Sequence, residues 1–277
     1  MNSYKKLKTV LNDLRVNKKS LLAFNLQNFY QFEAAQTASE NLKLPLIIQF
    51  SERYLKFLDQ KYGLDYIMNR YSNKYIYFHL DHCKDLELIK FCIESGFDSV
   101  MYDGSSEPLE NNIHNTKQVM EWAHHVGCLV EGELGEVAGV EDGFGHEGSS
   151  YAELEEVVKY QKETNIDLLA LGIGNAHGFY SDLDQIDMSI LKETSAILKD
   201  QFFVLHGGTG LTDEIIDQAI NYGVIKINVS TQIKKTSTEL IVDYLDSNEL
   251  YNEIKYHQSQ VDGLSQLFES FIIKYTR

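Results

Sequence analysis

The chain has 277 residues, of which 43% are hydrophobic, and a formal net charge of −16 at pH 7. This length and apolar fraction are typical of a globular protein with a substantial core, either one large α/β domain or two small ones. The acidic balance argues against nucleic acid as the main partner, because no cluster of Lys and Arg is available to neutralise phosphates.

The predicted elements alternate between strands and helices along the whole chain. An amphipathic helix at 4–18 leads into eight apolar strands, each of which ends in a polar residue or a glycine. The expected strands are residues 21–26, 44–50, 75–80, 99–102 and 128–134, the runs that begin at 168 and 202, and residues 224–229. The expected helices are residues 29–38, 86–95, 109–126, 151–164, 187–199, 212–222 and, at the end, 251–275.

Eight strands with helical patterns between them in about 250 residues predict an α/β fold, a (β/α)8 TIM barrel with extra C-terminal helices. We expect a single domain over 1–277, with the barrel at about 20–232 and a helical extension at about 233–277. An open, doubly wound sheet is the alternative, but its site would use only the few strand ends at one switch point. Polar residues at every strand end favour the closed barrel.

Three of the expected strands end in a histidine. His82 follows the strand at 75–80, whereas His177 and His206, each followed by glycine, end the runs from 168 and 202. If these strand ends converge, three neutral imidazoles with one open position make a catalytic zinc site. The alternative is that each is a satisfied core histidine. Asp81, beside His82, is expected to face the same polar site, because burying an unpaired carboxylate costs several kcal/mol by rough estimate.

A polar stretch at 135–150 contains five glycines and four acidic residues, among them Glu141. Loops of this length are uncommon in compact domains and are usually functional. A disordered surface loop is the alternative. We interpret the stretch as a mobile carrier of a catalytic base.

The cysteines, the first residues and the length of the apolar runs indicate the compartment and whether a membrane is involved. Cys83, Cys92 and Cys128 are odd in number and lack C-x-x-C spacing, so neither a disulfide framework nor a thiolate zinc site is indicated. A cytoplasmic location is therefore expected. The first residues lack the apolar core of a signal peptide, and no apolar run approaches the roughly 18 residues of a membrane span, so no membrane partner is expected.

Six ordered motifs give the sequence a resemblance to a known family. They are His-Leu-Asp-His (79–82), Ser-Val-Met-Tyr-Asp-Gly-Ser (99–105), Val-Glu-Gly-Glu-Leu-Gly with Gly-Val-Glu-Asp (130–142), Gly-Asn-Ala-His-Gly (174–178), Leu-His-Gly-Gly-Thr-Gly (205–210) and Lys-Ile-Asn-Val-Ser-Thr (226–231). With these motifs the chain resembles the class II, metal-dependent fructose-bisphosphate and tagatose-bisphosphate aldolases from about Leu21 to Thr231.

The resemblance implies Zn2+ held by His82, His177 and His206, with Glu133 able to approach the metal in some states. It also implies a substrate ketone that zinc makes acidic at the carbon next to the carbonyl. Glu141 matches the family's loop glutamate, the base that removes that proton. Asp81 matches the acid that protonates the incoming aldehyde oxygen.

The phosphate of the substrate needs a separate anchor. The glycine-rich loop after the seventh strand and the end of the eighth lie where TIM barrels commonly hold phosphate. A simple turn is the alternative for the glycines. The candidate substrate and phosphate residues are Asn25, Ser51, Gly178, Gly207, Gly208, Thr209, Asn228, Ser230 and Thr231. The resemblance further implies a monovalent cation, Na+ or K+, bound by carbonyls near Gly178 and Gly207.

The half of the site that would bind the aldehyde departs from the family pattern. Bisphosphate members use an arginine of the C-terminal region, supplied across a dimer, whereas residues 247–257 contain only Lys255. The lysine that many relatives carry after the second histidine motif is also missing. Arg53, just past the second strand at the start of a helix, is one of four arginines and a candidate for an anionic aldehyde. A solvated arginine is the alternative.

Three classes of function remain after these observations. The first is a zinc-dependent aldolase that forms dihydroxyacetone phosphate and an aldehyde from a ketose (bis)phosphate, as a homodimer or homotetramer. A metal-dependent TIM-barrel enzyme of another kind, such as a hydrolase, is the second, and it would not exchange a carbon-bound proton of dihydroxyacetone phosphate. The third, a phosphosugar-binding barrel without turnover, is disfavoured because Asp81, Glu141 and all three histidines are present.

Overall fold

The computed structural model describes residues 6–141, 144–146, 150–178, 180, 183–247 and 251–276. For residues 61, 140, 141 and 144–146 it describes the backbone alone. No helix in these ranges is long and apolar enough to cross a membrane.

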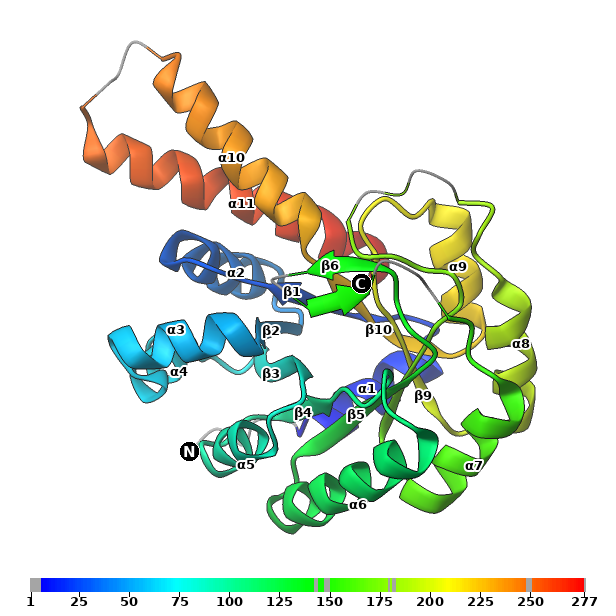
Figure 1. The fold of residues 1–277 in the computed structure, drawn as a ribbon. Helices are drawn as coiled ribbons and strands as arrows, with labels where there is room; N and C mark the ends of the chain where they lie inside the picture. Colours follow the sequence, from blue (N-terminus) through cyan, green and yellow to red (C-terminus); the bar gives the residue numbers. More distant parts are fainter. Residues whose placement is uncertain are drawn as a thin grey trace.

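Eight parallel strands close into a barrel in the order β1-β10-β9-β8-β5-β4-β3-β2 (Figure 1). They are β1 (Leu21–Asn25), β2 (Leu46–Ser51), β3 (Ile76–Cys83), β4 (Ser99–Tyr102), β5 (Leu129–Leu134), β8 (Leu168–Leu171), β9 (Phe202–Leu205) and β10 (Val224–Val229). The predicted (β/α)8 barrel is therefore confirmed, and the open doubly wound sheet is excluded.

Helices cover the outside of this barrel (Figure 1). They are α2 (Phe29–Leu42), α3 (Glu52–Tyr62), α4 (Leu64–Tyr71), α5 (Leu86–Glu94), α6 (Leu109–Val126), α7 (Leu154–Thr164), α8 (Met188–Ile197) and α9 (Asp213–Asn221). Several begin at a side-chain cap: Asn28, Asp85 and Thr212 each accept a hydrogen bond from a backbone N–H of the first turn. Helices α3 and α4 lie between residues 52 and 71, a segment for which no helix bounds were predicted.

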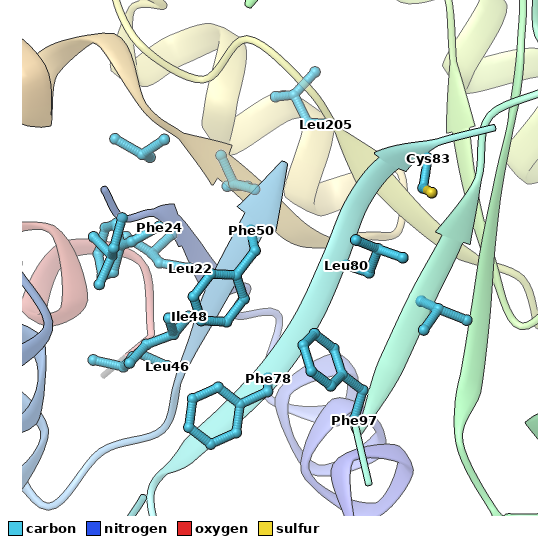
Figure 2. Close-up of a cluster of buried hydrophobic side chains, with 14 of the residues drawn as sticks. Leu22, Phe24, Leu46, Ile48, Phe50, Phe78, Leu80, Cys83, Phe97 and Leu205 are labelled. Atoms are coloured by element: carbon cyan, nitrogen blue, oxygen red, sulfur yellow. The ribbon is translucent and has the colours of Figure 1, made fainter. Parts of the chain in front are cut away.

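The outward faces of the strands form the main hydrophobic core with these helices. Figure 2 shows Leu22, Phe24, Ile48 and Phe50 among the side chains of this layer, all fully buried. Since neighbouring residues of a strand point to opposite faces, the alternate residues must fill the barrel interior.

The interior changes from apolar to polar along the strands. At the amino ends, Leu21, Ile47 and Phe202 pack with Leu7 and Leu11 of α1 (Leu7–Val16) in a second buried cluster, so this helix closes the bottom of the barrel. One layer further on, Asn25 pairs in register with Gln49, and Gln49 with His79. The polar side chains of the interior therefore lie toward the carboxyl ends of the strands, where TIM barrels have their active sites.

Two additions lie outside the βα repeat. Helices α10 (Thr231–Leu245) and α11 (Glu253–Tyr275) pair with each other and extend from the barrel beside α2 (Figure 1). The expected loop at 135–150 instead contains a two-stranded antiparallel sheet of β6 (Gly139–Glu141) and β7 (Phe144–His146). Strands of three residues are too short for an alternation of polar and apolar residues to predict them.

Candidate active site

The barrel brings the three predicted histidines together. His82 lies in β3, His206 directly follows β9, and His177 lies in the segment after β8. One ring nitrogen of each lies within 4.8 Å of the others. The ring centroid of His82 is 5.1 Å from that of His177 and 4.6 Å from that of His206.

A strained backbone lets two consecutive residues face this cluster. Asp81 and His82 would point to opposite faces of an ordinary strand. His82 has a φ of 44°, and the pairing of β3 with β4 shifts register between Leu80 and Cys83. A positive φ at a non-glycine residue costs of order 1–3 kcal/mol and is found mostly at functional sites. Here it places the carboxylate and the imidazole side by side.

Carboxylates orient two of the three imidazoles. His82 Nδ1 lies 2.8 Å from Asp103 Oδ2, and His206 Nε2 lies 2.8 Å from Glu131 Oε1. Because a carboxylate only accepts, each of these ring nitrogens carries the hydrogen. This assignment leaves His82 Nε2 and His206 Nδ1 as the nitrogens that face the cluster, and each offers a lone pair once a metal ion replaces its proton.

Carboxylates concentrate negative charge around the histidine cluster. Burial lowers the pKa of His82, but Asp81 and Asp103 outweigh it and raise the pKa to about 10. Burial and His82 also lower the pKa of His206, yet Glu131 and Glu133 raise it to about 9. Charges that favour a proton on these rings favour a divalent cation in the same place. His82 Nε2 is buried without a hydrogen-bond partner among the described residues, and the donor set of three imidazoles near a carboxylate fits zinc.

Asp81 is held as a carboxylate by amides from three other strands. Asn25 Nδ2 donates to its Oδ2 at 2.9 Å, Gln49 Nε2 to the same oxygen at 3.2 Å, and Asn228 Nδ2 to Oδ1 at 3.2 Å. Burial raises the pKa of Asp81, but His82 and Lys226 outweigh it and lower the pKa to about 2. Asp81 is therefore ionised and able to accept a proton.

The candidate phosphate residues gather after β9 and at the end of β10. Gly208 N donates to Asn228 O at 3.0 Å, and a Cβ on Gly208 would lie 2.8 Å from that oxygen, so its glycine is required by packing. Ser230 is the N-cap of α10, and its buried hydroxyl has no partner among the described residues. Thr209 Oγ1 accepts from Gln232 N at 3.4 Å, which ties the loop to the first turn of α10, where Thr231 begins the helix.

Two glycines expected beside a monovalent cation are also described. Gly178 and Gly207 have φ of 103° and 69°, a region that favours glycine. The carbonyl of Gly207 accepts a hydrogen bond from the Tyr180 hydroxyl at 2.9 Å. The second lone pair of that oxygen remains available to a cation.

The segment with the proposed base is anchored next to His177. His177 N donates to Ala138 O at 2.7 Å, and Ala138 N donates to Asn175 O at 3.2 Å. The backbone of Glu141 lies in β6, three residues after this anchor. Its side chain lies outside the described part of the chain.

Comparisons with known proteins agree with this geometry. The family model for class-II fructose-bisphosphate aldolase matches residues 5–275. The chain belongs to the class II fructose-bisphosphate aldolase family. Members of this family are metal-dependent lyases.

The similarity to class II aldolases extends over most of the chain. A fructose-bisphosphate aldolase of Staphylococcus aureus is 33% identical over 256 residues, covering 90% of this chain and 89% of the relative. One from Geobacillus stearothermophilus is 34% identical over 250 residues, covering 86% and 85%. The crystal structure of the YdjI aldolase from Escherichia coli K12 has the same fold, with a TM-score of 0.82, 23% identity and coverage of 99% and 98%.

The aldehyde-side candidates of this class II aldolase lie on different elements. Arg53 is exposed in the first turn of α3 and lines a cavity of about 320 Å³ with Gln27, Tyr54 and Phe57. Ser51, the N-cap of α3, is buried, and its hydroxyl has no hydrogen-bond partner among the described residues. Lys255 is exposed in the first turn of α11 and does not line this cavity.

Four buried residues that support the class II aldolase site were not among the predicted site residues. They are His79, Asp103, Glu131 and Lys226, each 7% exposed or less. Glu131 and Lys226 lie two residues before Glu133 and Asn228 on the same strands, so they share their inward face. For Glu131 and Lys226, a charged residue inside a strand was the signal that could have identified them.

Proposed function

We propose that the protein is a zinc-dependent class II aldolase that reversibly cleaves a ketose (bis)phosphate into dihydroxyacetone phosphate and an aldehyde. The observation that carries this proposal is the three-histidine cluster directly beside an Asp81 carboxylate held by three amides. A small phosphosugar is the substrate class that this site and its glycine-rich neighbour fit.

His82, His177 and His206 would hold the zinc ion, and Glu133, whose Oε2 lies 3.2 Å from His206 Nδ1, would be an additional ligand in some states. When bound, zinc supplies Lewis acidity that stabilises negative charge on the substrate's carbonyl oxygen. The hydrogen bonds to Asp103 and Glu131 keep the ring nitrogens in the ligating tautomer.

Two residues would move protons at different atoms of the substrate. In cleavage, ionised Asp81 takes the proton of the hydroxyl next to the bond that breaks, and in condensation it returns that proton to the aldehyde oxygen. Glu141 would exchange the proton on the carbon of dihydroxyacetone phosphate. It lies in the β6–β7 hairpin, which is anchored by backbone hydrogen bonds beside His177, so it would be close to the bound substrate.

The phosphate of dihydroxyacetone phosphate would bind between the loop at Gly207–Thr209 and the amino end of α10. The Ser230 hydroxyl and the backbone N–H of Thr231 supply donors there, and a helix amino end favours an anion. Asn25 and Asn228, which hold Asp81, would also border the substrate. A Na+ or K+ ion on the carbonyls of Gly178 and Gly207 would offset part of the phosphate charge.

The aldehyde half of the site would differ from that of bisphosphate aldolases. An exposed guanidinium at Arg53, two residues after Ser51 in the sequence, would bind an anionic end of the aldehyde bidentately. Lys255 is the second candidate, as a weaker point-charge partner.

An aldehyde screen tests this function. The zinc-loaded protein is incubated with dihydroxyacetone phosphate and a panel of phosphorylated, carboxylated and neutral aldehydes, and new carbon–carbon bonds are detected by mass spectrometry. We expect condensation with at least one member, and formation of the same product at least about 10²-fold more slowly with Asp81→Asn. Absence of any product from fully zinc-loaded, folded protein would contradict the proposal.

The remaining expectations are proposals as well. We propose one domain, assembled as a homodimer or homotetramer in the cytoplasm. Free, buried Cys83, Cys92 and Cys128 support the reducing compartment. Exposed Leu245, Tyr251 and Ile254 at the ends of α10 and α11 support the self-association, because a second copy would cover them.

A further inference from the structure

A lysine lies buried in the barrel interior, below the histidine cluster. Lys226 of β10 has no exposed surface, although lysine is almost never fully buried unless it is paired. Its Nζ lies 2.9 Å from Glu131 Oε2 on β5. An unpaired charge at this depth would cost several kcal/mol by rough estimate, so the two residues depend on each other.

Glu131 connects this lysine to a proposed zinc ligand. Its Oε1 accepts the hydrogen of His206 Nε2 at 2.8 Å, while its Oε2 faces Lys226 and also lies 3.6 Å from His79 Nε2. Both Glu131 and His206 are fully buried, so water cannot replace any of these partners. The carboxylate orientation therefore depends on which of its neighbours attracts each oxygen.

A second group of buried donor atoms includes the carboxylate of this ion pair. His79, Asp81 and Glu131 each offer a ligand atom within 4.8 Å of the others. Of these three residues, Glu131 is the one that Lys226 contacts, through the 2.9 Å ion pair of its Nζ with Oε2.

We propose that Lys226 is a positioning residue that holds Glu131 against His206, so that His206 presents Nδ1 to the zinc ion. This inference rests on the proposed zinc site. Without the ammonium, His79 Nε2 is the remaining nitrogen beside Glu131 Oε2, and the carboxylate turns toward it. His206 then loses the acceptor that fixes its ring orientation and tautomer.

Two variants and one control separate positioning from folding. Lys226→Met removes the charge at similar volume. The double variant Glu131→Gln with Lys226→Met replaces the buried ion pair by neutral groups, which is often neutral or stabilising for folding. Lys192→Met, an exposed lysine of α8, is the matched control. Zinc affinity is measured by competition with a chelator, ligand geometry by the visible spectrum of the Co2+ form, and stability by thermal unfolding.

In Lys226→Met, Glu131 would turn away from His206, so His206 would lose its hydrogen-bond partner. We therefore expect zinc affinity to fall roughly 10- to 100-fold, the range found when the partner of a metal-bound histidine is lost. In the double variant, stability returns toward that of the wild type, but zinc binding stays weak and the Co2+ spectrum stays altered. Lys192→Met leaves all three readouts unchanged.

Zinc affinity within about twofold of the wild type in folded Lys226→Met would overturn the inference. Loss of the hydrogen-bond partner of a metal-bound histidine normally lowers metal affinity about tenfold or more. Recovery of affinity together with stability in the double variant would overturn it too, because Lys226 would then be merely structural. If the wild type binds zinc with one ion per chain and only the variants behave differently from expectation, this inference alone falls. A wild type that binds no zinc removes the proposed function along with it.

Discussion

Three neutral amides determine what Asp81 does in the site. Asn25, Gln49 and Asn228 come from β1, β2 and β10 and all donate to its carboxylate. His82 and Lys226 lower the pKa of this carboxyl against its burial, and the amides donate hydrogen bonds to its charged form. We propose that Asp81 accepts a proton in the cleavage direction, and a change to Asn would remove this ability at nearly the same side-chain volume.

Asp81→Asn should lower the rate of carbon–carbon cleavage by about 10²- to 10⁴-fold, the usual contribution of a general acid–base group. It should keep zinc and much of the exchange of the carbon-bound proton of dihydroxyacetone phosphate. Glu141→Gln should lose that exchange. Both are measured in the same two assays, by product formation and by NMR in D2O. If the two variants lose both activities equally, the division of roles is wrong.

Asp98 lies outside the candidate active site, and its raised pKa makes the stability of the fold depend on pH. Burial raises the pKa of Asp98 from 3.8 to about 6, although Phe78 N donates to its Oδ2 at 2.9 Å. A carboxyl with a raised folded-state pKa destabilises the folded state once the unfolded chain ionises, so stability is lost as pH rises from about 4 to about 6.

Asp98→Asn keeps an acceptor for Phe78 N and cannot ionise. We predict that its free energy of unfolding exceeds that of the wild type by about 1–3 kcal/mol above pH 6, with a smaller difference at pH 5. Urea unfolding at pH 5 and 8 measures this difference. The exposed Asp243→Asn is the control and should show no such trend. An equal difference at both pH values would refute the linkage.

At the scale of elements, the strand ends were predictable and the backbone details were not. The apolar run of β3 indicated a strand that delivers Asp81 and His82, but alternation alone would have sent them to opposite faces. The φ of 44° at His82 that brings them together depends on tertiary contacts, such as the hydrogen bond to Asp103 from the next strand. Likewise, β6 and β7 are too short to show a period in sequence.

Arg53, in the first turn of α3, is predicted to decide which aldehyde the enzyme binds. Arg53→Ala should raise the Michaelis constant for an anionic aldehyde about tenfold or more, because a charge-assisted pair is lost, and leave the affinity for dihydroxyacetone phosphate unchanged. Steady-state kinetics with each substrate varied in turn measures both. Arg70→Ala, an exposed arginine of α4, is the control. Unchanged constants for both substrates would leave Arg53 as a surface residue and point to Lys255 or a neutral aldehyde.

At the scale of the whole molecule, barrel closure is what assembles the site. β1 pairs with both β2 and β10, so Asn25, Asp81 and Asn228 meet although 203 positions separate the first from the last. The sequence predicted this closure from the number of strands and their polar ends. It could not predict the interior partners, such as Glu131 with Lys226, because strand register sets those pairs.

The central claim is that this barrel uses a metal held by His82, His177 and His206 to activate the carbon-bound proton of a ketose phosphate. The most direct measurement is solvent exchange of that proton in dihydroxyacetone phosphate, followed by proton NMR in D2O without any aldehyde. The account predicts exchange with zinc-loaded protein, loss of exchange after chelation, recovery when zinc is restored, and little exchange with His82→Ala. Folded protein with one zinc per chain that exchanges the proton no faster than buffer would contradict the account.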